Sequence, residues 1–239
     1  VYPIHPVRLM GRLIANGEKF LRARIRHEKT AGALLALAVP VFVLILSWAF
    51  ISMLTRVNPV LGFVAETFGI YSVLSVRDLQ KEGIRIYKDL GKGEIEKARA
   101  DLGRIVGRDT QSLDQKEVLR ASIETIAEST VDGVISPLFY AVLGGAPLAL
   151  AYKAVNTLDS MIGHQNERYR DFGFVAAKQD GLWNWIPARI SYYVIVLASL
   201  LFNGRIQEVA FVGWQDGISG SCGNSAIPEA AFAGALGVR

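Results

Sequence analysis

The chain has 239 residues, of which 51% are hydrophobic, and its mean hydropathy is +0.29. These values are high for a soluble domain, although charged residues still make up 20% of the sequence and are concentrated between apolar runs. This alternation predicts an all-α, polytopic integral membrane protein with amphipathic cytoplasmic helices, folded as a single membrane-embedded domain. The net charge of +4 is modest and is not spread over a basic face, which argues against a nucleic-acid partner.

The first 30 residues carry seven Lys/Arg against two Asp/Glu and precede an apolar run. A basic flank of this kind is typical of the cytoplasmic side of a membrane protein, where it also interacts with anionic lipid. Pro6 predicts that a helix begins directly after His5. On residue type alone, His5 is either an ordinary turn histidine or a residue that binds substrate.

Three apolar segments are long enough to predict membrane spans, near residues 31–54, 57–76 and 183–204. The second contains Glu66, and a carboxylate inside a membrane is costly unless it faces protein or water. Glu66 is therefore either functional or neutralised, by protonation or by pairing. Trp183 and Trp185 are typical of the membrane–water interface, with stacking on a ligand as the less favoured alternative.

Residues 77–132 form a polar block with eleven Lys/Arg and twelve Asp/Glu. Such a balance of signs favours folded amphipathic helices over a charged tail. We predict a break at the Gly-Lys-Gly sequence of residues 91–93, between two helices. Asp114 and Glu117 have the spacing of a capping box and predict the start of a third helix.

We predict broken or re-entrant helices at 133–153, where the uncharged run 133–152 is interrupted by Gly144-Gly145-Ala146-Pro147. Two half-helices that meet at this sequence suit a re-entrant hairpin, which is permitted where protein covers the exposed backbone. A hairpin keeps the polar block and a polar loop at 154–182 on one side of the membrane, whereas a full span separates them. Chemistry that uses both polar segments favours the hairpin.

The remaining segment, 205–225, is glycine-rich and predicts a loop, and residues 227–239 predict a helix that is incomplete in this sequence. Cys222 is the single cysteine of the sequence, so an intrachain disulfide is excluded. We expect that neither terminus of the sequence is the natural one.

Polar residues with helical spacing lie on both sides of the interrupted run. Arg120, Glu124 and Glu128 recur every four residues and share one stripe of a helix. On spacing alone, a solvated helix face is the simpler interpretation of this stripe. Asn156 and Asp159 likewise share a face of a second helix. A metal site at His164 is not indicated, because no second His or Cys lies at ligand spacing.

Eight motifs occur in an order that resembles the CobD/CbiB family, adenosylcobinamide-phosphate synthases of cobalamin biosynthesis. The resemblance covers nearly the whole chain, and its specificity comes from the order of the motifs. The motifs are His5-Pro-Val-Arg8…Gly11; Val106-Gly-Arg108-Asp109-Thr; Arg120…Glu124…Glu128-x-Thr130-x-Asp132-Gly133; Pro137-Leu-Phe; Tyr152…Asn156-Thr-Leu-Asp159-Ser-Met-x-Gly163-His164; Tyr169…Phe172-Gly173; Asp180…Asn184-x-x-Pro187-Ala-Arg189; and Pro228-Glu229-Ala-x-x-Ala-Gly234-Ala-Leu.

The resemblance implies an ATP- and Mg²⁺-dependent ligase in the cell membrane, with its active site on the cytoplasmic side. The family joins the free propionate of adenosylcobyric acid to (R)-1-aminopropan-2-ol or its O-phosphate through an amide bond. A carboxylate is a poor acyl donor and must first be activated, most simply as an acyl phosphate. This chemistry requires carboxylates for Mg²⁺, donors for phosphate and a base for the amine.

The resemblance implies roles for particular polar residues of this chain. The catalytic candidates are Glu124, Glu128, Asp132 and Asp159, and the metal ligands among them are Glu128, Asp132 and Asp159. The substrate- and phosphate-binding candidates are His5, Arg8, Arg108, Arg120, Asn156, His164, Arg168, Asp180, Asn184, Arg189 and Asn224. No Walker-type loop occurs in the sequence, so ATP binding is implied by the resemblance alone.

The sequence also departs from the family pattern. Ser129 replaces an asparagine, Gly181 replaces the second of two aspartates, and residues 222–226 read Cys-Gly-Asn-Ser-Ala where the family has Ser-Pro-Asn-Ala-Gly. The Gly-Asp-Pro element expected before His5 is absent from the sequence given. These changes leave open a variant catalyst, a paralogue with another acyl or amine substrate, or a degenerate copy.

Two alternatives to the ligase follow from the same observations. One is a non-catalytic paralogue that binds a corrinoid or acts as a scaffold in the membrane. The other is a small transporter, which the large polar block and the few complete spans disfavour. The partners expected for the ligase are its corrinoid and amine substrates, membrane lipid, and either a second copy of the chain or other membrane enzymes of cobalamin assembly.

Overall fold

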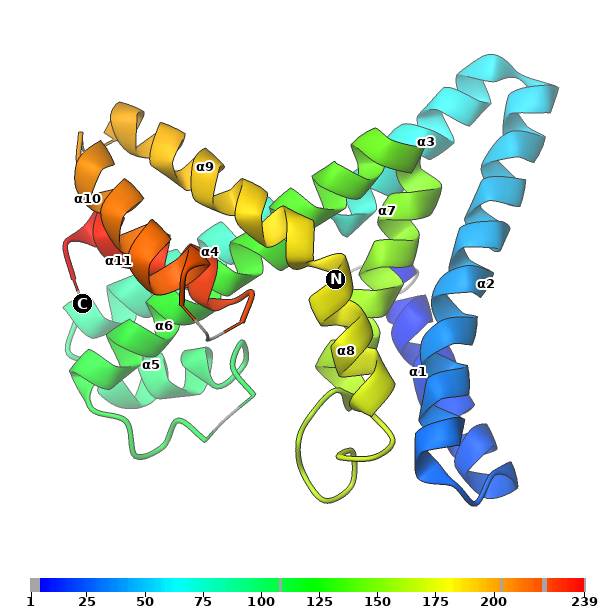
Figure 1. Cartoon of the computed structure of the whole chain (residues 1–239), viewed down its shortest axis with the longest axis horizontal. Coiled ribbons are helices and arrows are strands. Elements are labelled where there is room, and N and C mark those ends of the chain that lie inside the picture. Colours follow the sequence, from blue (N-terminus) through cyan, green and yellow to red (C-terminus); the bar gives the residue numbers. More distant parts are fainter. Residues whose placement is uncertain (1–4, 108, 203, 221–222, 239) are drawn as a thin grey trace. The chain divides into compact units, whose positions relative to one another are not determined.

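The computed structural model describes residues 5–107, 109–202, 204–220 and 223–238. Their regular structure consists of α-helices and two π-helices, with no strand in the described part of the chain, so the predicted all-α fold is confirmed (Figure 1). The predicted site residue Arg108 lies outside the described residues, as does Cys222.

The chain divides into two compact units, and the single membrane-embedded domain that the sequence indicates stays a prediction. The first unit comprises Val1–Leu74 and Ser136–Trp185, and the second comprises Ser75–Ile135 and Ile186–Arg239. Each unit is therefore discontinuous in sequence, because the polar block is inserted between α3 and α7 of the first unit.

The first unit packs around α2. Its helices are α1 (Pro6–Arg24), α2 (Glu28–Val57), α3 (Pro59–Val73), α7 (Ser136–Ile162) and α8 (Phe174–Trp183). Its core includes the buried side chains of Ile14, Leu35, Leu158 and Phe172. A Cβ on Gly32 would overlap the backbone carbonyl of Phe172, so glycine at this position allows α2 to lie directly against the segment that precedes α8.

The second unit begins with the polar block and ends with a group of short helices. Its elements are α4 (Val76–Gly91), α5 (Ile95–Leu102), α6 (Gln115–Thr130), the π-helix η1 (Val131–Ile135), α9 (Trp185–Phe202), α10 (Ile206–Val212), the π-helix η2 (Gly213–Ile218) and α11 (Ala226–Leu236). The predicted capping box is present: the Asp114 carboxylate accepts from Glu117 N–H at 2.8 Å, and the Glu117 carboxylate accepts from Asp114 N–H at 2.7 Å. These bonds fix where α6 begins.

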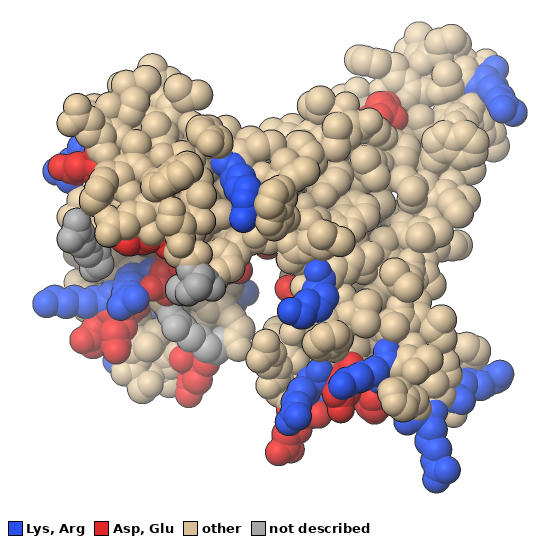
Figure 2. All heavy atoms as spheres, viewed as in Figure 1, with Lys and Arg blue, Asp and Glu red and all other residues tan. Residues whose placement is uncertain are grey.

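Within the described residues, four helical segments are long and apolar enough to cross a membrane: Glu28–Val57, Pro59–Gly91, Gln115–Ile162 and Trp185–Phe202. Large apolar side chains such as Phe42, Leu46 and Trp48 on α2 are exposed, as expected for contact with lipid. Figure 2 shows few charged side chains along α2 and α3 and a concentration of them where α1 meets α2. The chain is a multi-pass membrane protein.

α7 is a hairpin of two half-helices. Gly144 (φ −154°, ψ 25°) and Gly145 (φ 67°, ψ −162°) leave the helical conformation, at the predicted break. The rings of Tyr140 and Tyr152 stack with centroids 5.1 Å apart, whereas twelve residues of a straight helix would span about 18 Å. The halves therefore fold back on each other, as Figure 1 shows for α7. The placement of this hairpin in the bilayer stays a prediction.

The Glu66 side chain, on α3, contacts the backbone at the break in α7. Its Oε1 accepts the backbone N–H of Ala146 at 2.6 Å, at the start of the second half-helix. The positive end of a helix stabilises a carboxylate, and a Cβ on Gly145 would overlap this carboxylate. The structure thus gives Glu66 a backbone hydrogen-bond partner, and the alternatives that the sequence leaves open for this residue stay predictions.

Three segments are more helical than the sequence indicates. α7 continues to Ile162 and α8 occupies 174–183, so the loop predicted at 154–182 is confined to 163–173. α10 and η2 cover most of the loop predicted at 205–225. The last helix is not incomplete, because Gly237 (φ 67°, ψ 33°) ends α11 in the left-handed conformation that favours glycine.

Candidate active site

The acidic stripe of α6 is present as the spacing predicts. Arg120 Nε donates to Glu124 Oε1 at 2.7 Å across one helical turn. Glu124 is half-buried, whereas Glu128 and most of the Arg120 side chain are exposed. The stripe is therefore open to a ligand along one side of α6, within the second unit.

Glu229 adds a carboxylate to this stripe from α11. The pKa of Glu229 is raised from 4.5 to about 7, chiefly by burial and in addition by the neighbouring carboxylates of Glu128 and Glu124. The guanidinium of Arg120 acts in the opposite sense. A carboxyl group that titrates near neutral pH can accept or release a proton at physiological pH, which makes Glu229 an acid–base candidate.

A cavity of about 600 Å³ lies between α6 and α11. Its wall is mostly apolar, and its polar part is formed by side chains of both signs. The lining residues are Lys116, Leu119, Arg120, Ile123, Glu124, Asp216, Ala226, Glu229, Ala230, Ala233 and Val238. An apolar pocket with a few convergent charged groups is the usual form of a small-molecule site.

Two π-helices border this part of the second unit. η1 follows α6 directly and carries the half-buried Asp132. The Gly133 carbonyl oxygen accepts Ser75 N–H at 2.9 Å, and a Cβ on Gly133 would lie 3.1 Å from the Ser75 Cβ. η2 carries Asp216, which lines the cavity. Short π-helical segments occur often at functional sites, because they alter the direction of side chains.

Arg189 and Asn224 also lie together in the second unit. Arg189 Nη1 is 3.5 Å from Asn224 Oδ1, a long hydrogen bond that joins the start of α9 to the segment before α11. Both residues are substrate-binding candidates from the sequence. Their contact brings together two motifs that are 35 residues apart in the chain.

The first unit holds the second group of predicted residues, on the last turns of α7. Asn156 is buried and its Oδ1 accepts from Lys153 Nζ at 2.9 Å. Asp159 is half-buried one turn later, and His164 lies within electrostatic range of it. A Cβ on Gly163 would overlap the Asp159 carboxylate, so the glycine leaves room for that side chain.

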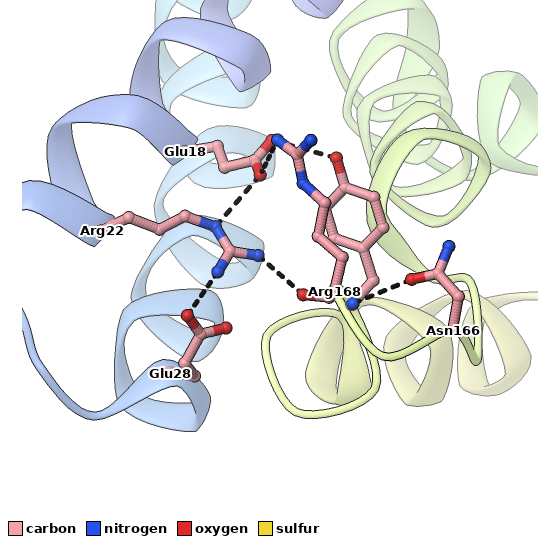
Figure 3. A network of polar contacts seen from close by, with 6 residues as sticks. Glu18, Arg22, Glu28, Asn166 and Arg168 are labelled. Carbon is pink, nitrogen blue, oxygen red and sulfur yellow. Dashed lines mark hydrogen bonds and ion pairs between the residues drawn. The ribbon is translucent and has the colours of Figure 1, made fainter.

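Arg168 is part of an ion-pair network that attaches the 163–173 loop to α1 (Figure 3). Its Nη2 lies 3.1 Å from Oε1 of the buried Glu18, and Arg22 Nη2 donates to the Arg168 carbonyl oxygen at 2.9 Å. Arg22 also pairs with Glu28. The Glu18 carboxylate raises the pKa of Arg168. The structure thus shows a role for Arg168 in loop attachment, and its contact with substrate stays a prediction.

Asn184 and Asp180 organise the junction between α8 and α9. Asn184 is buried, and its Oδ1 accepts from Ser136 Oγ at 2.6 Å and from Tyr152 Oη at 2.9 Å. Its Nδ2 donates to Asp180 Oδ2 at 3.0 Å. Because Ser136 and Tyr152 belong to different halves of α7, Asn184 holds the hairpin closed.

Trp183 also contacts the hairpin, with its ring centroid 4.9 Å from that of Tyr140. Trp185 is exposed, which suits an interface residue. His5 precedes α1 as its N-cap residue, and Arg8 is exposed on the first turn of that helix. The substrate-binding role of Arg8 stays a prediction.

Glu128 and Asp132 belong to the second unit, whereas Asp159 belongs to the first. Among the described residues, no group of three or more His, Cys, Asp or Glu side chains is arranged to hold a metal ion. The predicted metal set stays a prediction.

Sequence reasoning missed three residues of the cavity. Glu229 belongs to one of the motifs of the resemblance. Its position in a helix of small residues does not indicate that it lies near the carboxylates of α6. Lys116 precedes Arg120 by four residues and extends the same stripe. That spacing is a signal that could have identified Lys116, whereas Asp216 lies in a segment that predicts a loop.

The family model described as CobD/Cbib protein matches residues 2–239. The cobalamin biosynthesis protein CobD of Clostridium perfringens is 44% identical over 238 residues, which cover 99% of this chain and 76% of the relative. CobD of Geobacter metallireducens is 44% identical over 235 residues, covering 98% and 74%. The cobalamin biosynthesis protein CbiB of Salmonella typhi is 38% identical over 238 residues, covering 98% and 75%. No solved structure matches this chain. The chain therefore belongs to the CobD/CbiB family, and its role lies in cobalamin assembly.

Proposed function

We propose that this protein is the amide ligase that joins adenosylcobyric acid to (R)-1-aminopropan-2-ol or its O-phosphate, with its active site on the cytoplasmic side of the cell membrane. Family membership supports the pathway. One observation carries the chemistry: Glu229, whose pKa is raised to about 7, lies near two further carboxylates beside a cavity of about 600 Å³. A base with this pKa is suited to deprotonating an amine near neutral pH.

In this proposal, different residues of the second unit bind the amine, accept its proton and exclude water. An amine enters as its ammonium form, which the carboxylates of Glu124 and Glu128 stabilise. The Glu229 carboxylate accepts one proton from it, and the neutral nitrogen can then attack the carbonyl carbon of the activated propionate. The C–N bond forms as the bond from that carbon to its leaving phosphate oxygen breaks, and the second proton that the nitrogen loses passes to the departing phosphate. Apolar side chains such as Ile123 keep water from competing with the amine.

The donor chemistry of this region suits the cofactors that the family implies. Mg²⁺ is commonly held by one or two carboxylates together with phosphate oxygens, and Glu128 and Asp132 supply such carboxylates from adjoining elements. ATP, when bound with Mg²⁺, supplies the activation of the propionate. Arg120 lines the cavity and can donate to phosphate oxygen.

The test is amide formation by a Glu128→Gln variant, measured as conversion of adenosylcobyric acid in detergent with ATP, Mg²⁺ and amine. We expect a loss of activity of about 10²-fold or more with unchanged folding and membrane insertion, because the amide cannot replace the carboxylate's charge. Glu96→Gln is the matched control, since the Glu96 side chain is mostly exposed in the same unit. Wild-type turnover by Glu128→Gln would refute its role, and corrinoid binding without any amide formation by the wild type would favour a scaffold.

A further inference from the structure

The side of α4 that faces away from the core of the second unit carries two adjacent stripes of exposed side chains. In the first stripe, Val76, Ile84 and Tyr87 are 54%, 45% and 73% exposed, although they are apolar or aromatic. At about 100° per residue, these three side chains lie within about 80° of one another around the helix. They form an apolar surface that the described residues leave exposed.

Basic residues form the second stripe, directly beside the first. Arg77, Lys81 and Lys88 are exposed and lie within about 40° of one another around the same helix. No ion pair with any of the three occurs in the described part of the chain. The carboxylates of Asp78 and Glu82 lie on the side toward α6, where both residues line a small cavity. The positive charge of the basic stripe is therefore available to an anionic partner.

α4 follows the apolar part of a membrane-crossing segment. α3 and α4 together make up Pro59–Gly91, one of the segments long and apolar enough to cross a membrane. Seven charged residues lie in α4, whereas Glu66 is the charged residue of α3, so the apolar part of the segment ends with α3. The first turn of α4 therefore lies near the level at which the chain leaves the hydrocarbon.

An anionic phospholipid fits both stripes at once. Its phosphate accepts hydrogen bonds from Lys and Arg, and each basic residue near an anionic membrane surface favours binding about fivefold. Apolar side chains beside basic ones are typical of helices that lie in the membrane interface, where tyrosine is also enriched. A soluble polyanion would engage the basic stripe alone and leave Val76, Ile84 and Tyr87 in water.

We propose that α4 lies in the membrane interface, where Arg77, Lys81 and Lys88 bind the head groups of anionic phospholipid and Ile84 and Tyr87 insert at the boundary of the acyl chains. The proposal does not depend on the amide chemistry proposed above, because lipid contact is measured without turnover.

The experiment places a fluorescent label on the apolar stripe and measures which lipid reaches it. Cys222→Ser removes the single cysteine of the sequence, and Gln80→Cys provides an exposed labelling site among the apolar residues. Ala100→Cys, an exposed position on α5, is the control site. The full chain is reconstituted in phosphatidylcholine nanodiscs with a small, equal fraction of phosphatidylglycerol or phosphatidylcholine that carries a nitroxide near its head group.

We expect the nitroxide lipids to quench the label at residue 80 at least about twofold more strongly than the label at residue 100. Nitroxide-labelled phosphatidylglycerol should quench residue 80 about threefold more strongly than nitroxide-labelled phosphatidylcholine, because the basic stripe enriches the anionic lipid.

This preference should depend on the basic stripe. Combining Arg77→Gln, Lys81→Gln and Lys88→Gln should lower the ratio to about one, and salt at about 0.5 M should do the same in the wild type by screening the charges. Lys116→Gln, an exposed lysine on α6 of the same unit, should leave the ratio unchanged.

A label at residue 80 that lipid quenches no more than the label at residue 100 would overturn the proposal, since this face of α4 would then contact water or another protein. Equal quenching by the two lipids would also overturn it, as would a preference for phosphatidylglycerol that survives the triple substitution.

Discussion

Glu229 shows how a single side chain acquires a function from its surroundings. It lies on an apolar helix, where burial removes water from its carboxylate, and Glu128 and Glu124 lie close enough to disfavour a further negative charge. Each effect destabilises the ionised form, so the group keeps its proton up to a pH of about 7. The raised pKa suits Glu229 to proton transfer. It also means that ionisation of Glu229 lowers the free energy of unfolding.

This cost predicts a pH-dependent effect of Glu229→Gln on stability. The pKa of Glu229 rises from 4.5 to about 7 on folding, so the native state holds the proton between these values and wild-type stability falls as pH rises through them. Glutamine cannot ionise. At pH 8 we expect the variant to melt about 2–4 °C above wild type, for a difference of about 1 kcal/mol after solvent screening. Scanning calorimetry in detergent should show this difference vanish below pH 4.5; equal melting temperatures at pH 8 would contradict the assignment.

At the residue scale, contacts within one element could be predicted from the sequence, and contacts between elements could not. The Arg120–Glu124 pair follows from helical spacing alone. The approach of Glu229 to α6 depends on how α11 packs, and no local pattern encodes it. The same reason applies to Arg168, whose partner Glu18 is 150 residues away.

At the scale of elements, the conformation of the α7 hairpin depends on the residues at its turn and on the side chains that hydrogen-bond to its two halves. Gly145 provides the left-handed backbone, Glu66 accepts the first N–H of the second half-helix, and Asn184 binds both halves. The sequence indicates the break, because glycine and proline disfavour a continuous helix. It does not indicate the π-helices or the length of α7, since short polar segments suit both loops and buried helices.

The hairpin predicts different effects for two glycine substitutions. Gly145 and Gly204 both have a φ of 67°, but a Cβ on Gly204 meets nothing within 4 Å, whereas one on Gly145 overlaps the Glu66 carboxylate. We expect Gly204→Ala to cost about 1 kcal/mol from backbone strain alone. Gly145→Ala should cost about 1 kcal/mol more, because it also displaces a half-buried acceptor, the Glu66 carboxylate. Thermal melting in detergent measures both; equal losses would show that Glu66 does not constrain the turn.

At the scale of the whole molecule, the predicted site residues are distributed over both units. Asn156 and Asp159 lie in the first, and Glu124, Glu128 and Asp132 lie in the second. The order of motifs along the chain identifies the family, but it does not say which motifs share a unit. That the two groups form one site stays a prediction, and so does the common membrane side of the polar block and the 163–173 loop.

The central claim is that Glu229 accepts the proton of the amine, and the pH dependence of kcat for amide formation tests it most directly. With saturating amine and corrinoid, the wild-type rate should rise about tenfold per pH unit at low pH and level off above a pH of about 7. Glu229→Gln should lose about 10²-fold in rate and also lose this inflection. A variant that keeps the wild-type rate and the same inflection would contradict the account.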